Sequence, residues 1–332
     1  MQCPETFSRA DDAASLQLNA AGELRHLLTL DGLDRVTLSS LLDEAERFVS
    51  PPGSRAKRSR SLAGRTVANL FFEPSTRTRA SFDLAGKRLG ADVLNLDVNT
   101  SSRKKGESIL DTIYTLEAMQ VDIMVVRDAG AGVPAYIARH VNAHTSILNA
   151  GEADVAHPTQ GLLDLLTIRQ RLGGFENLTV AIVGDIAHSR VARSAAHGLH
   201  TLGVRELRLV APPGLAPAVD EMPYAKIVDN LDNGLRDANV VMALRIQHER
   251  IEDLAGIPDA DDYYANFGIS SERLAIAASN VVVMHPGPMN RGIEIESSLA
   301  DSPRSAITQQ VANGVAVRMA VLERVSKTMA PN

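Results

Sequence analysis

Residues 66–89, TVANLFFEPSTRTRASFDLAGKRL, decide the fold. The first seven residues of this segment are mostly apolar and predict a strand, while residues 79–89 place apolar side chains at helical spacing. Between them, Glu73-Pro74 ends the strand and is followed by three hydroxyl side chains and two arginines. A strand that leads directly into a helix is the repeating unit of a parallel α/β sheet. Ligands of such sheets collect at the carboxyl ends of the strands, so the polar run lies where a binding site is expected.

The same alternation of β-rich runs and amphipathic segments continues along the chain. The expected strands are residues 66–72, 92–97, 122–127, 146–150, 179–185, 206–212, 239–244 and 280–285. Helices are expected at residues 79–89, 108–119, 161–172 and 190–202, with a long final helix at 307–325. The pattern predicts the α/β class, with two doubly wound parallel-sheet domains, interdomain helices, and a C-terminal helix that returns to the first domain.

The expected strands divide into two units, because four precede residue 151 and four follow it. A chain of 332 residues is long enough for two packed cores. The polar stretch 149–160 is the expected crossing between them. We therefore expect one domain of residues 1–157 plus 305–332 and a second domain of residues 158–304.

Composition and charge argue against several classes of function. The formal net charge of −6 disfavours broad nucleic-acid binding, and the basic loop 55–60 has no interleaved aromatic residue, so we interpret it as a solvated surface loop. No apolar run approaches the ~18 residues of a membrane span, and the N-terminal residues lack an apolar signal core, so we expect a cytoplasmic protein. The single cysteine, Cys3, excludes an internal disulfide, and His140 with His144 makes a weak metal site without a third ligand.

The polar run after the first strand has the layout of a helix N-terminus, where unpaired backbone N–H groups bind phosphate or carboxylate. Ser75, Thr76 and Thr78 add hydroxyl donors, and the Arg77 guanidinium can form a fork to phosphate oxygens. In the simpler alternative, Ser75 or Thr76 caps the helix and the arginines lie in water. Capping explains one hydroxyl but not the whole run, so an anion site is favoured.

Residues 71–82, FFEPSTRTRASF, resemble the carbamoyl-phosphate motif shared by aspartate and ornithine carbamoyltransferases. The resemblance extends from about residue 25 to residue 325. It implies that the serine, the two threonines and the first arginine of the motif hold the phosphate and the carbonyl group of carbamoyl phosphate. These residues are Ser75, Thr76, Arg77 and Thr78.

The segment 99–108, NTSSRKKGES, would by itself indicate a flexible surface loop. In the aspartate-specific members of the family, the similar segment reaches into the active site of the neighbouring subunit of a trimer. The resemblance therefore implies a homotrimer in which Ser101 and Lys105 bind carbamoyl phosphate across the interface, with Lys105 also contacting the acceptor. Lysine suits this role because it is a flexible point charge.

Three further elements complete the implied donor site. Arg127 ends an expected strand and could pair with Asp128 or another carboxylate, but the resemblance implies that it contacts the phosphate and the carbonyl oxygen. A lone histidine is more often structural than catalytic. In residues 157–160, HPTQ, however, the resemblance implies that His157 donates a hydrogen bond to the carbonyl oxygen of carbamoyl phosphate. It also implies that the Gln160 amide contacts the carbamoyl nitrogen. Residues 284–295, MHPGPMNRGIEI, would by themselves indicate a tight turn. The resemblance implies that the backbone carbonyls of Gly287 and Pro288 face the reacting nitrogens and that the Gly287-Pro288 peptide bond is cis.

The second half carries the candidate acceptor site. VGDIAHSRVARS superficially suggests a dinucleotide fold but lacks the G-x-G-x-x-G spacing, and its Arg190 is placed to meet a carboxylate. ALRIQHER resembles the aspartate-specific version of the family's element, which implies that Arg245 and Gln247 bind aspartate. The structural alternative for Arg245 is a salt bridge to Glu249, four residues on. Ornithine enzymes usually have a cysteine directly after the histidine of the later turn, and this chain has Pro286 at that position.

The resemblance implies carbamoyl transfer from carbamoyl phosphate to the α-amine of L-aspartate, the committed step of de novo pyrimidine (UMP) synthesis. Thr78, Arg127 and His157 would stabilise the oxyanion, Arg77 and Lys105 would offset the charge on the leaving phosphate, and no cofactor or metal is expected. Closure of the two domains around both substrates is a further hypothesis. The alternatives are an ornithine or other amino-acid carbamoyltransferase and a non-catalytic anion-binding scaffold subunit. A regulatory or dihydroorotase-type partner chain is left open.

Overall fold

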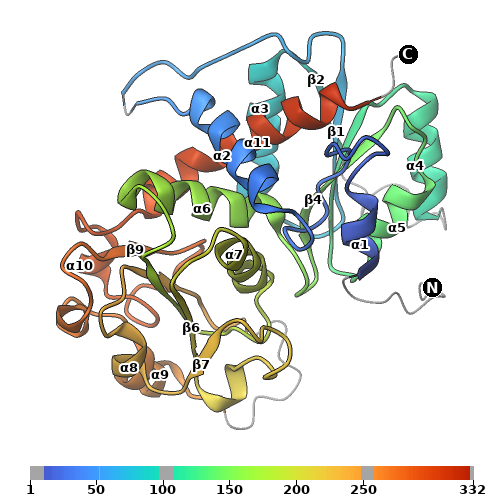
Figure 1. Cartoon of the computed structure of the whole chain (residues 1–332). Coiled ribbons are helices and arrows are strands. Elements are labelled where there is room, and N and C mark those ends of the chain that lie inside the picture. Colours follow the sequence, from blue (N-terminus) through green and yellow to red (C-terminus); the bar gives the residue numbers. More distant parts are fainter. Residues whose placement is uncertain (1–10, 52, 97–107, 248–256, 330–332) are drawn as a thin grey trace. The chain divides into compact units, whose positions relative to one another are not determined.

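The structure is a computed structural model, and it describes residues 11–51, 53–96, 108–247 and 257–329 (Figure 1). The chain forms two compact units, one of Met1–Thr159 with Asn313–Asn332 and one of Gln160–Ala312. It passes from one unit to the other inside helix α6 (Pro158–Leu172) and returns inside helix α11 (Ile307–Lys327). Within the described ranges, no helix combines the length and the apolar character needed to span a bilayer.

The first unit is built on a parallel sheet with the strand order β2-β1-β3-β4. The strands are β1 (Thr66–Phe71), β2 (Asp92–Leu96), β3 (Ile123–Asp128) and β4 (Ser146–Glu152). The chain moves outward from β1 to β2, then returns past β1 to β3 and continues to β4. The winding therefore reverses between β1 and β3, and the carboxyl ends of these two strands form the topological switch point where doubly wound sheets bind ligands.

Helices cover this sheet and bury its central strands. They are α1 (Asp11–Leu16), α2 (Arg35–Phe48), α3 (Thr76–Leu89), α4 (Ile109–Ala118) and α5 (Val133–His140). The central strand β3 is buried along its whole length, as expected of a parallel strand covered on both faces. The edge strand β2 is largely exposed, whereas the other edge strand, β4, is buried along its whole length.

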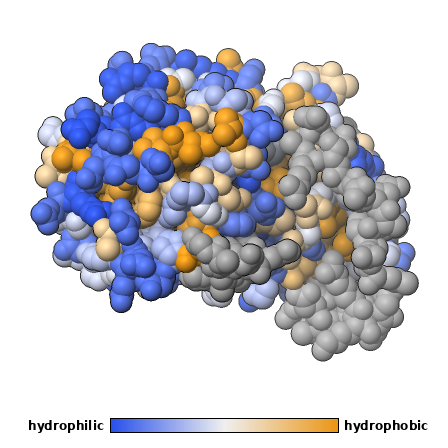
Figure 2. Space-filling view, turned by 90° about the horizontal axis from the view of Figure 1, so that it is seen from below, coloured by the Kyte–Doolittle hydropathy of each residue, from blue (hydrophilic) through white to orange (hydrophobic). Residues whose placement is uncertain are grey.

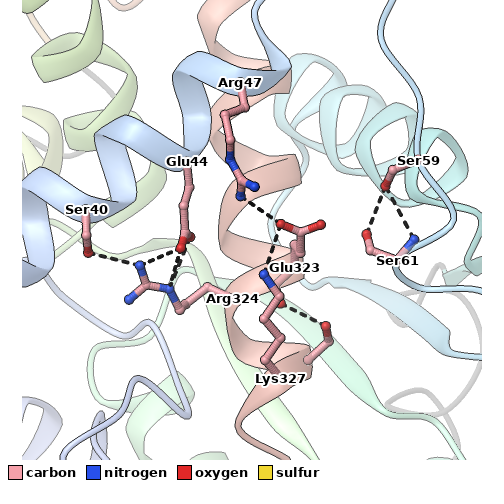
Figure 3. A network of polar contacts seen from close by, with 9 residues as sticks. Ser40, Glu44, Arg47, Ser59, Ser61, Glu323, Arg324 and Lys327 are labelled. Atoms are coloured by element: carbon pink, nitrogen blue, oxygen red, sulfur yellow. Dashed lines mark hydrogen bonds and ion pairs between the residues drawn. The ribbon is translucent and has the colours of Figure 1, made fainter.

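The C-terminal helix returns to the first unit, as predicted. Near its end, the Arg324 guanidinium contacts the Glu44 carboxylate of α2 with Nη2 2.7 Å from Oε1, and Arg47 and Lys327 both reach the Glu323 carboxylate (Figure 3). Arg324 also donates to the Ser40 hydroxyl. These contacts fasten α11 to α2, so residues from the two ends of the chain pack together.

The second unit contains a parallel sheet with the strand order β7-β6-β5-β8-β9. The strands are β5 (Thr179–Val183), β6 (Glu206–Val210), β7 (Lys226–Val228), β8 (Val240–Ala243) and β9 (Val282–Met284). The helices are α7 (Arg190–Thr201), α8 (Leu231–Leu235), α9 (Ala260–Phe267) and α10 (Ser297–Ala300), with 3₁₀ turns at Pro213–Leu215 and Arg273–Ile276. This order reverses its winding between β5 and β8, which gives the second unit its own switch point.

The two-domain doubly wound class is confirmed, and each of the expected strands is present with altered ends. Strand β5 stops at Val183, two residues earlier than predicted, because Gly184 has φ +133 and turns the chain. The short strand β7 was not predicted, since Ile227-Val228 is only a two-residue β-branched run between Lys226 and Asp229.

The large apolar side chains that are exposed in the described part of the chain come from several different elements. Among the large ones, Val36 lies on α2, Met119 follows α4, Val219 lies in a loop and Val311 lies on α11. On the face drawn in Figure 2, apolar residues lie among hydrophilic ones. Scattered exposure of this kind is ordinary for a folded domain.

Candidate active site

The polar run of the first unit lies at the switch point between β1 and β3. Phe71, the last residue of β1, is in register with Arg127 of β3, and the chain beyond Phe71 enters α3 within a few residues. Ser75 is the N-cap residue of α3 with extended backbone, but its side chain makes no capping hydrogen bond. The structural alternative, in which this hydroxyl only caps the helix, is therefore not supported.

The residues after Ser75 form the first turn of α3 and differ in exposure. Thr76 and Arg77 are exposed, whereas Thr78 is buried. The N-terminal end of a helix presents backbone N–H groups and partial positive charge. The arrangement can therefore receive an anion with hydroxyl, guanidinium and backbone donors drawn from four consecutive residues.

Arg127 is a buried cation at the end of β3, with an exposed fraction of 7%. Its Nη1 donates to the Ala150 carbonyl oxygen at 3.2 Å, and its Nη2 contacts the Glu73 carboxylate. The sequence left open a pairing of Arg127 with a carboxylate, and Glu73 is that partner. Sequence reasoning missed Glu73, although an acid directly after a strand, in line with an arginine on the neighbouring strand, is a recognisable signal.

His157 and Gln160 lie at the start of α6, and both are buried. His157 precedes the first residue of the helix, and Gln160 lies in its first turn. The Gln160 Nε2 donates to the Asp164 Oδ1 at 3.0 Å, one turn further along the helix. The amide of Gln160 is thus held by a carboxylate that sequence reasoning did not single out.

The switch point of the second unit is organised by Gly184 and Asp185, directly after β5. A Cβ atom at Gly184 would lie 2.2 Å from the Leu244 carbonyl oxygen, so only glycine permits this close approach of the two strand ends. The fully buried Asp185 carboxylate accepts the Gln247 backbone N–H at 3.0 Å and the His188 backbone N–H at 3.2 Å. It therefore fixes the segment that follows β8.

The predicted acceptor residues follow the carboxyl ends of β5 and β8. Arg190 is the first residue of α7 and is buried, with Ser189 capping the helix through the Ala192 N–H. Arg245 and Gln247 follow β8 and are half-buried. Arg190, Arg245 and Gln247 thus lie on segments that leave the same, carboxyl edge of the sheet.

The turn after β9 contains the predicted cis Gly287-Pro288 peptide bond. The His285 Nδ1 accepts the Gly287 N–H at 2.8 Å, so the ring proton is on Nε2, which donates to the Glu294 Oε1 at 3.0 Å. Glu294 also accepts the Asn290 N–H. Since His285 and Glu294 are both buried, the turn is held from inside.

Buried carboxylates also shape the electrostatics of the second unit. Burial raises the pKa of the Tyr263 hydroxyl above its usual value, and the charges of Glu294 and Asp185 raise it further. Tyr263 therefore stays protonated over the physiological range.

Two predicted residues, Ser101 and Lys105, lie outside the described residues.

The fold and its polar strand ends define a two-domain α/β protein with a switch point in each domain. Two family models match the chain, each described as Aspartate/ornithine carbamoyltransferase: the carbamoyl-P binding domain at residues 25–170 and the Asp/Orn binding domain at residues 176–325. The chain belongs to the aspartate/ornithine carbamoyltransferase family, an enzyme family. The resemblance seen in the sequence is thereby confirmed.

Solved structures of this family are similar over nearly the whole chain. Aspartate transcarbamoylase from Trypanosoma cruzi in complex with carbamoyl phosphate is 30% identical, with a TM-score of 0.82 over 94% of this chain and 97% of that chain. The catalytic subunit of M. jannaschii aspartate transcarbamoylase is 29% identical, with a TM-score of 0.79 over 92% and 98%. Ornithine carbamoyltransferase from Thermus thermophilus is 27% identical, with a TM-score of 0.78 over 91% and 98%. Because both aspartate and ornithine enzymes match, the overall similarity does not identify the acceptor amino acid, and its identification depends on the residues of the second unit.

Proposed function

We propose that the protein is an aspartate carbamoyltransferase, which converts carbamoyl phosphate and L-aspartate into N-carbamoyl-L-aspartate and phosphate. In the cell this is the committed step of de novo pyrimidine (UMP) synthesis, carried out in the cytoplasm. The observation that carries the proposal is the pair of arginines, Arg190 and Arg245, at the switch point of the second unit. A substrate with two carboxylates is matched by two guanidinium groups, whereas ornithine carries an ammonium group that they would repel.

The first unit is the carbamoyl-phosphate-binding domain in this proposal. Ser75, Thr76, Arg77 and Thr78 hold the phosphate at the N-terminus of α3. Thr78, Arg127 and His157 stabilise the negative charge that develops on the carbonyl oxygen. An arriving anion also competes with Glu73 for the Arg127 guanidinium, which is a cost that the positive end of α3 offsets.

The second unit is the aspartate-binding domain. Arg190 and Arg245 bind the two carboxylates of aspartate, and Gln247 adds an amide contact. Asp185 holds the Gln247 backbone, so the carboxylate acts on substrate binding without touching the substrate. The Gln160 amide contacts the carbamoyl nitrogen, and the carbonyl groups of Gly287 and Pro288 face the reacting nitrogens, which orients the carbonyl carbon.

The reaction needs no nucleophile from the protein. The neutral α-amine attacks the carbonyl carbon, a C–N bond forms, and the bond from that carbon to the phosphate oxygen breaks. The amine loses one proton, which leaves with the phosphate. Rate enhancement comes from fixed positive charge and from positioning, and the reaction requires no cofactor or metal.

The active site is shared between subunits of a homotrimer, and Ser101 with Lys105 is contributed by the neighbouring chain. Two inactive variants test this arrangement. Lys105→Ala and Arg245→Ala trimers are each expected to be inactive, and mixed trimers are expected to recover part of the activity, since some sites then receive both intact residues. Mixed trimers as inactive as their parents contradict a shared site.

Two arginines on the same helix test the acceptor site. Arg190→Ala is expected to lower kcat/KM for aspartate by about 10–100-fold, the effect of losing a charge-assisted hydrogen bond. Arg193→Ala is the matched control, because its guanidinium pairs with Glu221 and its loss is expected to change kcat/KM by less than about twofold. Equal effects of the two substitutions would remove Arg190 from the site.

A further inference from the structure

A continuous chain of buried hydrogen bonds runs through the second unit. The Gln160 Nε2 donates to the Asp164 Oδ1 at 3.0 Å, and the Gln310 Nε2 donates to the same oxygen at 2.8 Å. At its other end, the Gln310 amide accepts the His285 backbone N–H through Oε1 at 3.0 Å. From His285 the chain continues to the Gly287 N–H and the Glu294 carboxylate.

Donor and acceptor chemistry sets the direction of every bond in this chain. A backbone N–H can only donate, so the oxygen of the Gln310 amide must face His285 and its nitrogen must face Asp164. The same Asp164 oxygen accepts the Gln160 Nε2–H, so the Gln160 nitrogen also faces Asp164. The Gln160 oxygen therefore points away from Asp164. With the opposite flip, an amide oxygen and a carboxylate oxygen would be in contact and would repel.

Burial makes this orientation costly to change. Asp164 is fully buried, and Gln310 is only 2% exposed. Water does not readily replace a lost partner at such a position, and an unsatisfied buried group is expensive. The orientation of the Gln160 amide is thus set by Asp164, and that of the Gln310 amide by Asp164 together with the His285 backbone N–H.

We propose that Asp164 and Gln310 are positioning residues that present the Gln160 oxygen and the Gly287 turn to the carbamoyl NH₂ group. The inference rests on the proposed function, which places that group at these acceptors. An NH₂ group offers two donors, and an amide oxygen with a backbone carbonyl offers two acceptors. Asp164 and Gln310 touch neither substrate and act through Gln160 and His285.

Acetyl phosphate is the probe that isolates this role. It carries a methyl group where carbamoyl phosphate carries NH₂, and the phosphate and the carbonyl are otherwise alike. A site that orients acceptors toward NH₂ binds carbamoyl phosphate more tightly than acetyl phosphate, because the methyl group leaves the acceptors without donors. The ratio of the two dissociation constants measures the positioning, whereas general damage to the fold weakens both ligands alike.

The experiment measures both dissociation constants by calorimetry for the wild-type trimer and for Gln310→Met, Asp164→Ala and Gln309→Met. Gln309→Met is the matched control, since Gln309 is the adjacent residue of α11 and bonds instead to Gln170 and Arg171. We expect the preference for carbamoyl phosphate to fall about tenfold in Gln310→Met and in Asp164→Ala and to stay within about twofold in Gln309→Met. Gln310→Met serves alone if Asp164→Ala does not fold.

The outcomes separate the inference from the proposed function. If the wild-type protein prefers carbamoyl phosphate and Gln310→Met retains that preference, the positioning role is wrong and the proposed function stands. If the wild-type protein binds the two ligands equally, the placement of the NH₂ group is wrong and the inference falls with it. Equal losses for Gln309→Met and Gln310→Met also overturn the inference, because they indicate damage to α11 in general.

Discussion

Replacement of Asp185 by asparagine tests how the second unit builds its acceptor site. One carboxylate oxygen of Asp185 accepts the His188 backbone N–H and faces the His188 ring, and the other accepts the Gln247 N–H at 3.0 Å. Asparagine has the same shape, but it has one oxygen, so its NH₂ group must face one of these donors. Because the Asp185 side chain is fully buried, water is not expected to replace the lost hydrogen bond.

The magnitude follows from the lost bond. A hydrogen bond to a charged group contributes about 1.5–3 kcal/mol, and each 1.4 kcal/mol is a factor of ten. We therefore expect Asp185→Asn to lower kcat/KM for aspartate by about 10–100-fold. The dissociation constant of carbamoyl phosphate should change by less than about twofold, since the proposed phosphate site lies in the first unit.

The assay combines steady-state kinetics with varied aspartate and calorimetric binding of carbamoyl phosphate. Asp259→Asn is the matched control, because Asp259 accepts the Asp262 N–H at the N-cap of α9, a position where asparagine serves equally well. The reasoning is refuted if Asp185→Asn keeps kcat/KM for aspartate within about threefold of the wild-type value while remaining folded.

Three further predictions concern other parts of the molecule. Burial, assisted by the charge of Arg25, lowers the pKa of His26 to about 3, so between pH 3 and pH 6.5 only the unfolded chain takes up a proton at this residue. The free energy of unfolding, measured with urea, should therefore fall by about 2 kcal/mol from pH 7 to pH 5. The fall should be smaller in His26→Asn, which keeps an acceptor for the Ile147 N–H. Glu73→Gln removes a negative charge that competes for Arg127, and we expect inorganic phosphate to bind about threefold more tightly; weaker binding would instead mean that the charge of Glu73 is needed to hold the guanidinium. Arg324→Met removes a partly exposed ion pair with Glu44, so unfolding should become easier by about 0.5–1 kcal/mol with kcat unchanged, and a large loss of kcat would contradict a purely structural role for this contact.

The fold was predictable because its signals are local. Alternating strands and helices indicated two doubly wound sheets, and the motif at residues 71–82 indicated an anion site at a strand end. The strand β7 was missed because its only β-rich signal is the pair Ile227-Val228, which is too short a run to predict a strand. The cis Gly287-Pro288 bond came from the family resemblance and not from the local sequence alone.

The supporting residues of the site were not predictable, because their partners are distant in the sequence. Asp185 and Gln247 are 62 residues apart, and Asp164 and Gln310 are 146 apart. No periodicity links such pairs, and a buried aspartate or glutamine in a helix reads as an ordinary polar position. The folded chain reveals them through burial and bond direction.

The identity of the acceptor is tested most directly by the initial rates of the wild-type protein with carbamoyl phosphate and either L-aspartate or L-ornithine. Both carbamoylated product and phosphate should be measured, so that transfer is distinguished from hydrolysis. We predict a kcat/KM for aspartate at least about a thousandfold above that for ornithine. The side-chain ammonium group of ornithine would have to lie beside two guanidinium groups, those of the buried Arg190 and the half-buried Arg245, which repel it. A preference for ornithine, or phosphate release without a carbamoylated amino acid, would contradict the proposed function.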